Sequence, residues 1–259
     1  MMMMNRISMN ARFLPIMAVA LVACDKDAEE VHEDLVGTPH ANTVVALTMS
    51  YTRTGAAFDK TVAFSDAAGT AVKIDRLRFY ISQVSFTDDA GDTVATFPEK
   101  YLLIDMDEGG LIRNIGELDG HLHEMHFGLG VDSATNHADP LTLDPPLSAP
   151  GMWWTWAAGH MFLSLEGRYD SNGNGVVDDT PGVDNEFLYH CGMDTLYTPV
   201  TLHVHTDADE GGNVALPIDL NIDTLLAGMD IGAHPVIQEV TPITRELMEH
   251  LAAGLSHVE

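Results

Sequence analysis

The chain has 259 residues, 46% of them hydrophobic, and its 39 acidic and 12 basic residues give a formal net charge of −27. Such an acidic surface repels phosphate backbones, which argues against nucleic acid as a partner and favours cations, although it also serves simple solubility. No linker or internal repeat divides the chain, so we expect one folded domain.

The first predicted element is a secretion signal. A positively charged start precedes an apolar run, residues 13–23, that is too short to span a bilayer. The run ends in LVAC (residues 21–24), the cleavage pattern of a bacterial lipoprotein. We therefore expect residues 1–23 to be a lipoprotein signal peptide and Cys24 to carry a lipid anchor, on the periplasmic side of a bacterial membrane or at the cell surface. An ordinary secretory signal is the alternative, and residues 24–42 are expected to form a flexible acidic tether.

Residues 43–259 show mostly period-two hydrophobicity, which is typical of strands with one buried face. In chain order the clearest runs are TVVALTMSY (43–51), RLRFYISQVSF (76–86), TVATFPEKYLLIDMD (93–107), HEMHFGLGVD (123–132), WWTWAAGHMFLSLEG (153–167), FLYHCG (187–192), TPVTLHVHTD (198–207) and VALPIDLNI (214–222). They predict an all-β domain, an antiparallel β-sandwich of about eight or nine strands. A short C-terminal helix is predicted after Thr241, which can cap it, with leucines at every fourth position, and another short helix near residues 223–229.

Two H-x-H pairs, His121/His123 and His203/His205, fall in predicted strands of a chain that has 13 histidines. Residues i and i+2 of a strand point to the same face about 6.6 Å apart, so the imidazoles of a pair can converge on one ion. Copper and zinc favour imidazole ligands. Each histidine taken singly is more simply a core or surface residue, and the hypothesis depends on their concentration.

The tryptophans are concentrated in GMWWTWAAGH (151–160). Trp154 and Trp156 share one face of the predicted strand and, in the simpler interpretation, fill the core. An indole nitrogen only donates hydrogen bonds, but opening the ring to kynurenine would free an amine that binds metal. In a flat strand Trp156 and His160 are about 13 Å apart, so metal ligands would come from neighbouring strands.

His160 and His190 are the remaining candidate metal ligands. His190 is followed by Cys191, the one cysteine besides Cys24, so no intrachain disulfide is expected in the mature chain. In a strand their side chains face opposite ways, and Cys191 is expected to be a buried thiol, although a copper thiolate is the alternative.

The segment DSNGNGVVDD (170–179) resembles a calcium loop. Oxygen donors occupy positions 1, 3, 5 and 9 of an EF-hand-type pattern, and a glycine occupies position 6. Position 12 is Pro181, so a further carboxylate, from Asp179, Asp184 or Glu186, is required. The predicted calcium ligands are Asp170, Asn172, Asn174, Asp178 and Asp179. An Asx-rich turn would use the same residues.

Several separated motifs carry a family resemblance: RLRFYISQVSF, YLLIDMD, HFGLGVDSATNHADP, the block from PPL to GMWWTWAAGHMFLSLEG, and FLYHCG. Over roughly residues 43–225 their order resembles the MbnP-like family of copper-associated exported proteins, related to the CorA and MopE proteins of methane oxidisers. The resemblance implies a β-sandwich that binds copper through histidines and a tryptophan-derived kynurenine. It also implies a partner di-haem protein, similar to cytochrome c peroxidase and MauG, that oxidises the tryptophan.

In this resemblance the tryptophan motif falls on Trp154 and Trp156, and the H-x-G motif falls on His190. The chain has Gly159-His160 where the family motif has Gly-Tyr, and it lacks the additional cysteines of many relatives.

These features predict a lipid-anchored protein that captures or delivers copper. The alternative is a calcium-stabilised surface β-sandwich with an adhesion or structural role. An enzyme ranks below both, because the sequence has no nucleophile–base pair of recognisable spacing, no phosphate loop and no CxxCH haem motif.

Overall fold

The computed structural model describes residues 42–108, 112–155, 157–180, 182–209 and 211–258. The predicted signal peptide, Cys24, residues 24–41 of the predicted tether and Trp156 lie outside these residues. The described residues belong to one compact unit, Pro39–Glu259. In this part of the chain no helix has the length and apolar character needed to cross a membrane.

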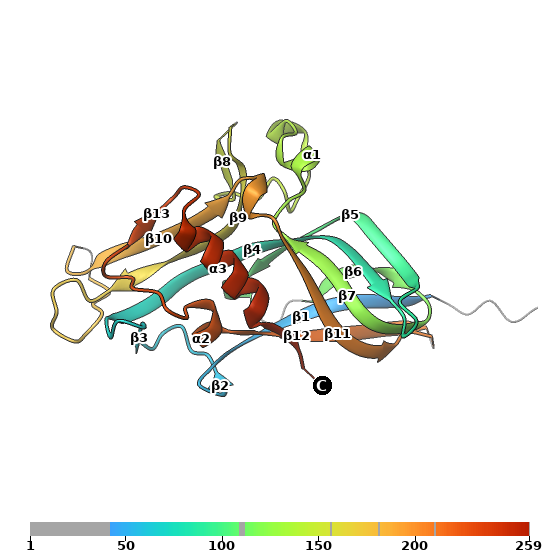
Figure 1. Ribbon diagram of the computed structural model, residues 1–259, viewed down its shortest axis with the longest axis horizontal. Helices are drawn as coiled ribbons and strands as arrows, with labels where there is room; N and C mark the ends of the chain where they lie inside the picture. Colours follow the sequence, from blue (N-terminus) through green and yellow to red (C-terminus); the bar gives the residue numbers. More distant parts are fainter. Residues whose placement is uncertain (1–41, 109–111, 156, 181, 210, 259) are drawn as a thin grey trace, which may run out of the picture. The chain divides into compact units, whose positions relative to one another are not determined.

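Two mixed sheets make up the fold (Figure 1). The smaller has the order β14-β12-β1-β2, with β6 also paired to β1. Its strands are β1 (Thr43–Arg53), β2 (Ala56–Ala57), β6 (Arg113–Leu118), β12 (Gly212–Asn221) and β14 (Leu255–His257).

The larger sheet has the order β11-β7-β4-β9-β10-β13, with β3 and β5 paired to β4, and β8 paired to β9. Its strands are β3 (Phe64–Ser65), β4 (Ala71–Thr87), β5 (Thr93–Asp105), β7 (His121–Leu129), β8 (Trp153–Thr155), β9 (Gly159–Tyr169), β10 (Asn185–Gly192), β11 (Thr198–Asp207) and β13 (Val236–Ile237). The helices are α1 (Ser133–Asn136), α2 (Ile222–Leu225) and α3 (Pro242–Gly254), with short 3-10 turns η1 (Met106–Glu108), η2 (Pro140–Thr142) and η3 (Asp194–Leu196).

Strand β4 serves two neighbours along one edge. Its first half, from Val72 to Phe79, pairs with β9, and its second half, from Ile81 to Thr87, pairs with β7. The pairings of β4 with β5 and with β7 both shift register around Gln83, whose φ of 53° is left-handed. Such a bulge bends a strand and increases its twist. It divides the larger sheet into a β9–β10 part and a β7–β11 part.

The mainly β, sandwich-like fold and the C-terminal helix confirm the predicted fold class. Two strand pairs, β1–β12 and β10–β13, are parallel, so the sheets are mixed and not wholly antiparallel. Parallel pairing requires a long connection, which period-two spacing does not reveal. The described residues contain 14 strands, more than predicted, because strands of two or three residues are too short to show a period.

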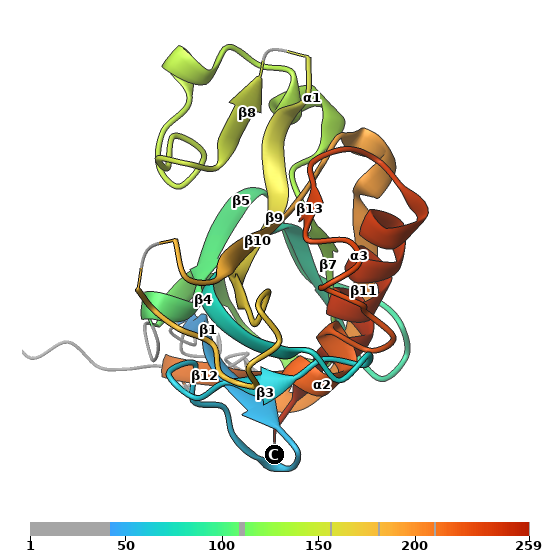
Figure 2. The ribbon, with the colours of Figure 1, turned by 90° about the vertical axis from the view of Figure 1, so that its left-hand side faces the viewer.

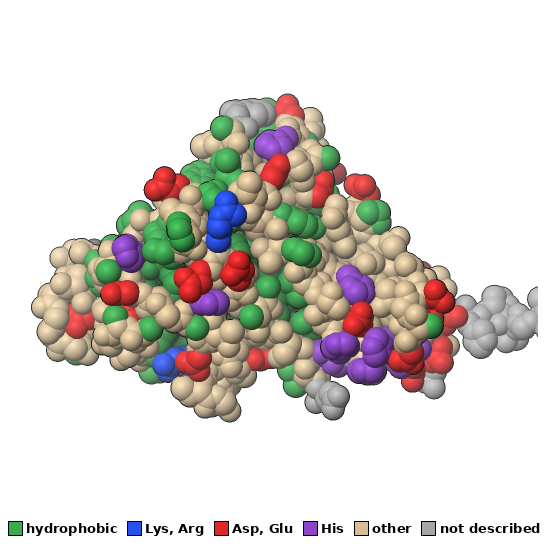
Figure 3. Space-filling view, in the orientation of Figure 1, with side chains coloured by type: hydrophobic (Ala, Val, Ile, Leu, Met, Phe, Trp, Pro, Cys, Tyr) green, Lys and Arg blue, Asp and Glu red, His purple; other side chains and the backbone are tan. Residues whose placement is uncertain are grey.

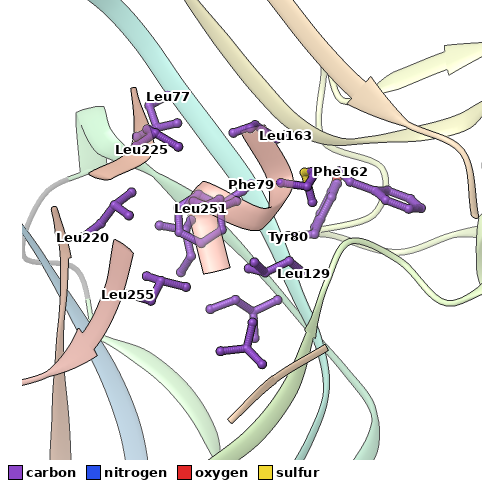
Figure 4. Packing of buried hydrophobic residues seen from close by; sticks show 14 of the residues in the cluster. Leu77, Phe79, Tyr80, Leu129, Phe162, Leu163, Leu220, Leu225, Leu251 and Leu255 are labelled. Atoms are coloured by element: carbon purple, nitrogen blue, oxygen red, sulfur yellow. The ribbon is translucent and has the colours of Figure 1, made fainter. Parts of the chain in front are cut away.

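Both sheets and the helices contribute to one hydrophobic core. Leu163 of β9, Leu220 of β12 and Leu251 of α3 are fully buried in it (Figure 4). Helix α3 begins as predicted: the Thr241 side chain accepts from the Thr244 backbone N–H, and the Thr244 hydroxyl accepts from the Thr241 N–H. This reciprocal capping fixes the start of the helix.

The single strand predicted over residues 153–167 is wrong. A turn after Thr155 folds the segment into a hairpin, with Trp153 paired to His160. Gly159 makes the turn possible, because its φ is +73° and a Cβ there would lie 2.1 Å from Asn136 Oδ1. The turn was not predicted because Ala157 and Ala158 are not residue types typical of turns. Strand β8 and helix α1 lie at the end of the fold away from β1 and β12 (Figures 1 and 2).

Candidate metal centre

The two H-x-H pairs lie on neighbouring strands. β7 and β11 pair antiparallel, with His121 opposite Asp207 and Glu124 opposite His203. Histidine side chains gather among acidic ones over this part of the sheet (Figure 3). We call His121, His123, His203 and His205 the histidine cluster.

A bulge in β11 turns its histidines toward those of β7. The register shifts between His203 and Thr206, so Val204 and His205 together face His123. His205 has a φ of 36°, a left-handed conformation that is uncommon for a residue with a Cβ. The ring centroids of His123 and His205 are only 4.4 Å apart, and those of His123 and His203 are 5.4 Å apart. The bulge therefore brings both imidazoles of β11 to His123.

Two overlapping groups of side chains converge here. One is His123, His203 and His205, and the other is Asp89, His121 and His205. In each group one ligand atom per residue lies within 4.8 Å of the others. Nitrogens bound tetrahedrally at about 2.0–2.1 Å from an ion are roughly 3.3 Å apart, so small side-chain rotations would close either group around an ion.

Carboxylates lie behind the imidazoles. Asp207 Oδ1 is 2.6 Å from His121 Nδ1, and Glu124 Oε1 is 3.4 Å from His203 Nδ1. A carboxylate on one ring nitrogen fixes the ring and leaves the other nitrogen for a metal. The hydrogen bond with Asp207 also raises the pKa of His121 above its ordinary value, with further contributions from nearby acids that include Asp89. Asp89, Asp207 and Glu124 were not predicted, because the sequence shows them only as turn and strand-end residues.

A second observation also indicates that these side chains could hold a transition metal. His123 Nδ1 is buried and makes no hydrogen bond. Asp89 Oδ1 lies 2.9 Å away, but outside hydrogen-bond geometry. A buried polar atom without a partner is uncommon in proteins and requires an explanation. A cation between imidazoles and a carboxylate would satisfy it.

A family model for MbnP matches residues 42–241. This chain belongs to the MbnP family. Among solved structures, MbnP from Methylosinus trichosporium aligns with a TM-score of 0.53 and 15% identity, over 77% of this chain and 82% of that chain. That likeness shows a shared fold. No curated protein matches the sequence.

Trp154 and the two other candidate histidines lie elsewhere in the fold. His160 is fully buried, its Nε2 lies 3.1 Å from the Leu147 carbonyl, and its Nδ1 lies 3.3 Å from Asn136 Oδ1. Burial lowers its pKa, which favours a neutral ring. Its ring packs edge-on against Trp153, at 5.0 Å between centroids. These contacts account for His160 as a core residue.

His190 is also fully partnered. Its Nε2 lies 3.1 Å from Glu166 Oε1, and its Nδ1 lies 3.0 Å from the Gln238 side-chain nitrogen. Trp154 lies edge-on at 6.3 Å and is half-buried against the core. The structure brings neither His190 nor His160 to the histidine cluster. Cys191 is buried, as predicted, and burial raises the pKa of its thiol to about 12.

The loop proposed for calcium is a network of Asx turns. Asp170 accepts from the backbone N–H groups of Gly173, Asn174 and Gly175. Asp179 instead pairs with Lys73 and Arg168. Within the described residues, the acids of this loop form no convergent group of three. These bonds are those of the Asx-rich turn, and calcium binding here stays a prediction.

Proposed function

We propose that this protein of the MbnP family binds copper at the histidine cluster, for capture or delivery and without turnover of its own. The observation that carries the proposal is the placement of four imidazoles on two neighbouring strands, with a bulge that turns His205 toward His123. Imidazole nitrogens suit copper, zinc, iron and nickel. The family resemblance favours copper among these metals.

The cluster is open to arriving ions. The His203 side chain is 66% exposed, and that of Asp89 is 71% exposed. Surrounding carboxylates and a net charge of −27 raise the local concentration of cations. An accessible, negatively charged approach with imidazoles beneath it suits a protein that takes up and releases an ion.

The proposal extends to export and processing. Residues 21–24 support lipid anchoring at Cys24, which would hold the protein at the periplasmic side of a bacterial membrane or at the cell surface. The tryptophan motif supports a di-haem partner that oxidises Trp154 or Trp156 to kynurenine. Trp154 lies beside His190. A kynurenine amine at that position would bind copper together with His190 only if the His190 imidazole gave up its bond to Glu166 or to Gln238.

Metal analysis of the purified protein tests the proposal. We expect about one copper ion per chain after equilibration and removal of excess metal. A variant with His121, His123, His203 and His205 all replaced by Ala should retain none. His234→Ala, a change at an exposed histidine outside the cluster, is the control. Full copper retention by the fourfold variant, with an unchanged circular dichroism spectrum, would overturn the proposed site.

A further inference from the structure

We propose that the histidine cluster offers two mutually exclusive ion positions that sort ions by charge. Monovalent copper takes the position formed by His123, His203 and His205. A divalent ion takes the position formed by Asp89, His121 and His205. The inference rests on the proposed function, because both positions belong to the same site.

The geometry separates the two positions. The described residues form two convergent groups of potential ligands, and His205 is the member that both groups share. His121 belongs to one group and His203 to the other, so the ligand atoms of all five residues do not converge on one point. His205 is also the residue that the bulge displaces, with its ring 4.4 Å from His123 and 6.4 Å from His121.

His205 makes the positions exclusive. A neutral imidazole has one lone pair on nitrogen, so it completes one coordination shell at a time. An ion bound with His123 and His203 therefore leaves the other position with only Asp89 and His121 from its group. The two positions compete for His205.

The donor chemistry differs between the positions. Three neutral imidazoles suit soft monovalent copper, which accepts a low coordination number. The other position adds the carboxylate of Asp89, whose negative charge offsets the second positive charge of a divalent ion. Asp207 holds His121 Nδ1, which directs Nε2 toward Asp89, 3.6 Å away.

The hairpin between β4 and β5 holds Asp89 over the sheet. Asp88 Oδ1 accepts from the backbone N–H groups of Ala90 and Asp92, each at 2.9 Å, and so fixes the turn. The Asp89 side chain takes no part in these bonds and reaches β7 instead, where its oxygens lie near His121 and His123. Asp89 therefore lies in the turn with its carboxylate placed to act as an anionic ligand.

Two metal probes, three single variants and one control variant test the inference. Zn²⁺ affinity is measured by calorimetry, and Cu⁺ affinity by anaerobic competition with a chromogenic chelator. Asp89→Asn should weaken Zn²⁺ binding about 10- to 100-fold and Cu⁺ binding much less, although Asp89 Oδ1 also lies 2.9 Å from His123 Nδ1. His203→Ala should weaken Cu⁺ binding much more than Zn²⁺ binding. His205→Ala should weaken both. Asp92→Asn, which removes the same charge from the same hairpin, should change neither.

A competition experiment tests exclusivity directly. Protein loaded with one equivalent of Cu⁺ should bind no Zn²⁺ at the cluster until the copper is removed. Simultaneous binding of both ions, or equal loss of both affinities in Asp89→Asn and in His203→Ala, would overturn the inference while leaving the proposed function intact. A wild-type protein that binds neither ion would overturn the proposed function itself.

Discussion

The two histidine-bearing parts of the larger sheet differ in what their imidazoles contact. In the β8–β9–β10 part, His190 has a hydrogen-bond partner on both ring nitrogens, and the buried ring of His160 lies between two acceptor oxygens in the core. In the β7–β11 part, the imidazoles face one another at the surface, Asp207 holds Nδ1 of His121, and Glu124 lies beside Nδ1 of His203. Proximity to tryptophan therefore does not bring a histidine into a convergent group of potential ligands. Only the imidazoles of the histidine cluster converge in this way within the described residues.

The largest expected effect concerns access to the β8–β9–β10 part. Because Cys191 is buried and burial raises its pKa to about 12, the native thiol should react with a thiol reagent at least about 100-fold slower than a free cysteine of pKa about 8.5. A colour reaction with the metal-free protein, with Cys24 replaced by Ser, measures this. The thiol should react fully once urea unfolds the chain. Rapid reaction in the native state would reopen the thiolate interpretation.

The second effect separates core histidine from surface histidine. His160→Ala leaves a cavity and removes the partner of the Leu147 carbonyl, so it should lower the free energy of unfolding by about 2–4 kcal/mol. His203→Ala, at an exposed position, should change it by less than about 0.5 kcal/mol in metal-free protein. Urea unfolding measures both. Similar losses in the two variants would contradict the contrast.

The third effect compares the carboxylates behind the two kinds of histidine. Asp207→Asn removes the group that orients His121 and should lower Zn²⁺ affinity about tenfold. Glu166→Gln makes the matching change behind His190 and should leave metal affinity unchanged. Calorimetry on both variants provides the comparison. A larger loss of Zn²⁺ affinity in Glu166→Gln than in Asp207→Asn would indicate that the metal binds in the β8–β9–β10 part.

The smallest effect is the titration of His121. Its pKa is raised by the bond to Asp207, so the imidazolium form should persist above the ordinary pH range for histidine. Since the folded pKa is raised, the pair stabilises the fold below the unfolded pKa, and this contribution is lost as pH rises through the folded pKa. NMR titration of metal-free protein should show the raised value, and Asp207→Asn should return it toward the ordinary one. An ordinary pKa for His121 in the wild-type protein would show that Asp207 does not hold its imidazole.

The strand positions of the two H-x-H pairs were predicted from local spacing. The H-x-H pairs were placed in strands, and β7 and β11 are strands. The carboxylates were not predicted: Asp89 resembles any acid in a DDAGD turn, and only the folded hairpin brings it to β7. His160 and His190 were candidates because sequence shows a histidine but not what its ring contacts.

The sequence by itself determined the mainly β fold, the capped C-terminal helix, the buried Cys191 and the two pairs of imidazoles, because each follows from period, composition or capping within a short segment. Only the tertiary structure decided that β7 and β11 are neighbours, that a bulge turns His205 onto His123, and that Asp89 and Asp207 complete the set. Strand pairing and register depend on contacts between residues far apart in the chain. A histidine cluster built across strands is therefore specified by the fold and not by any one motif.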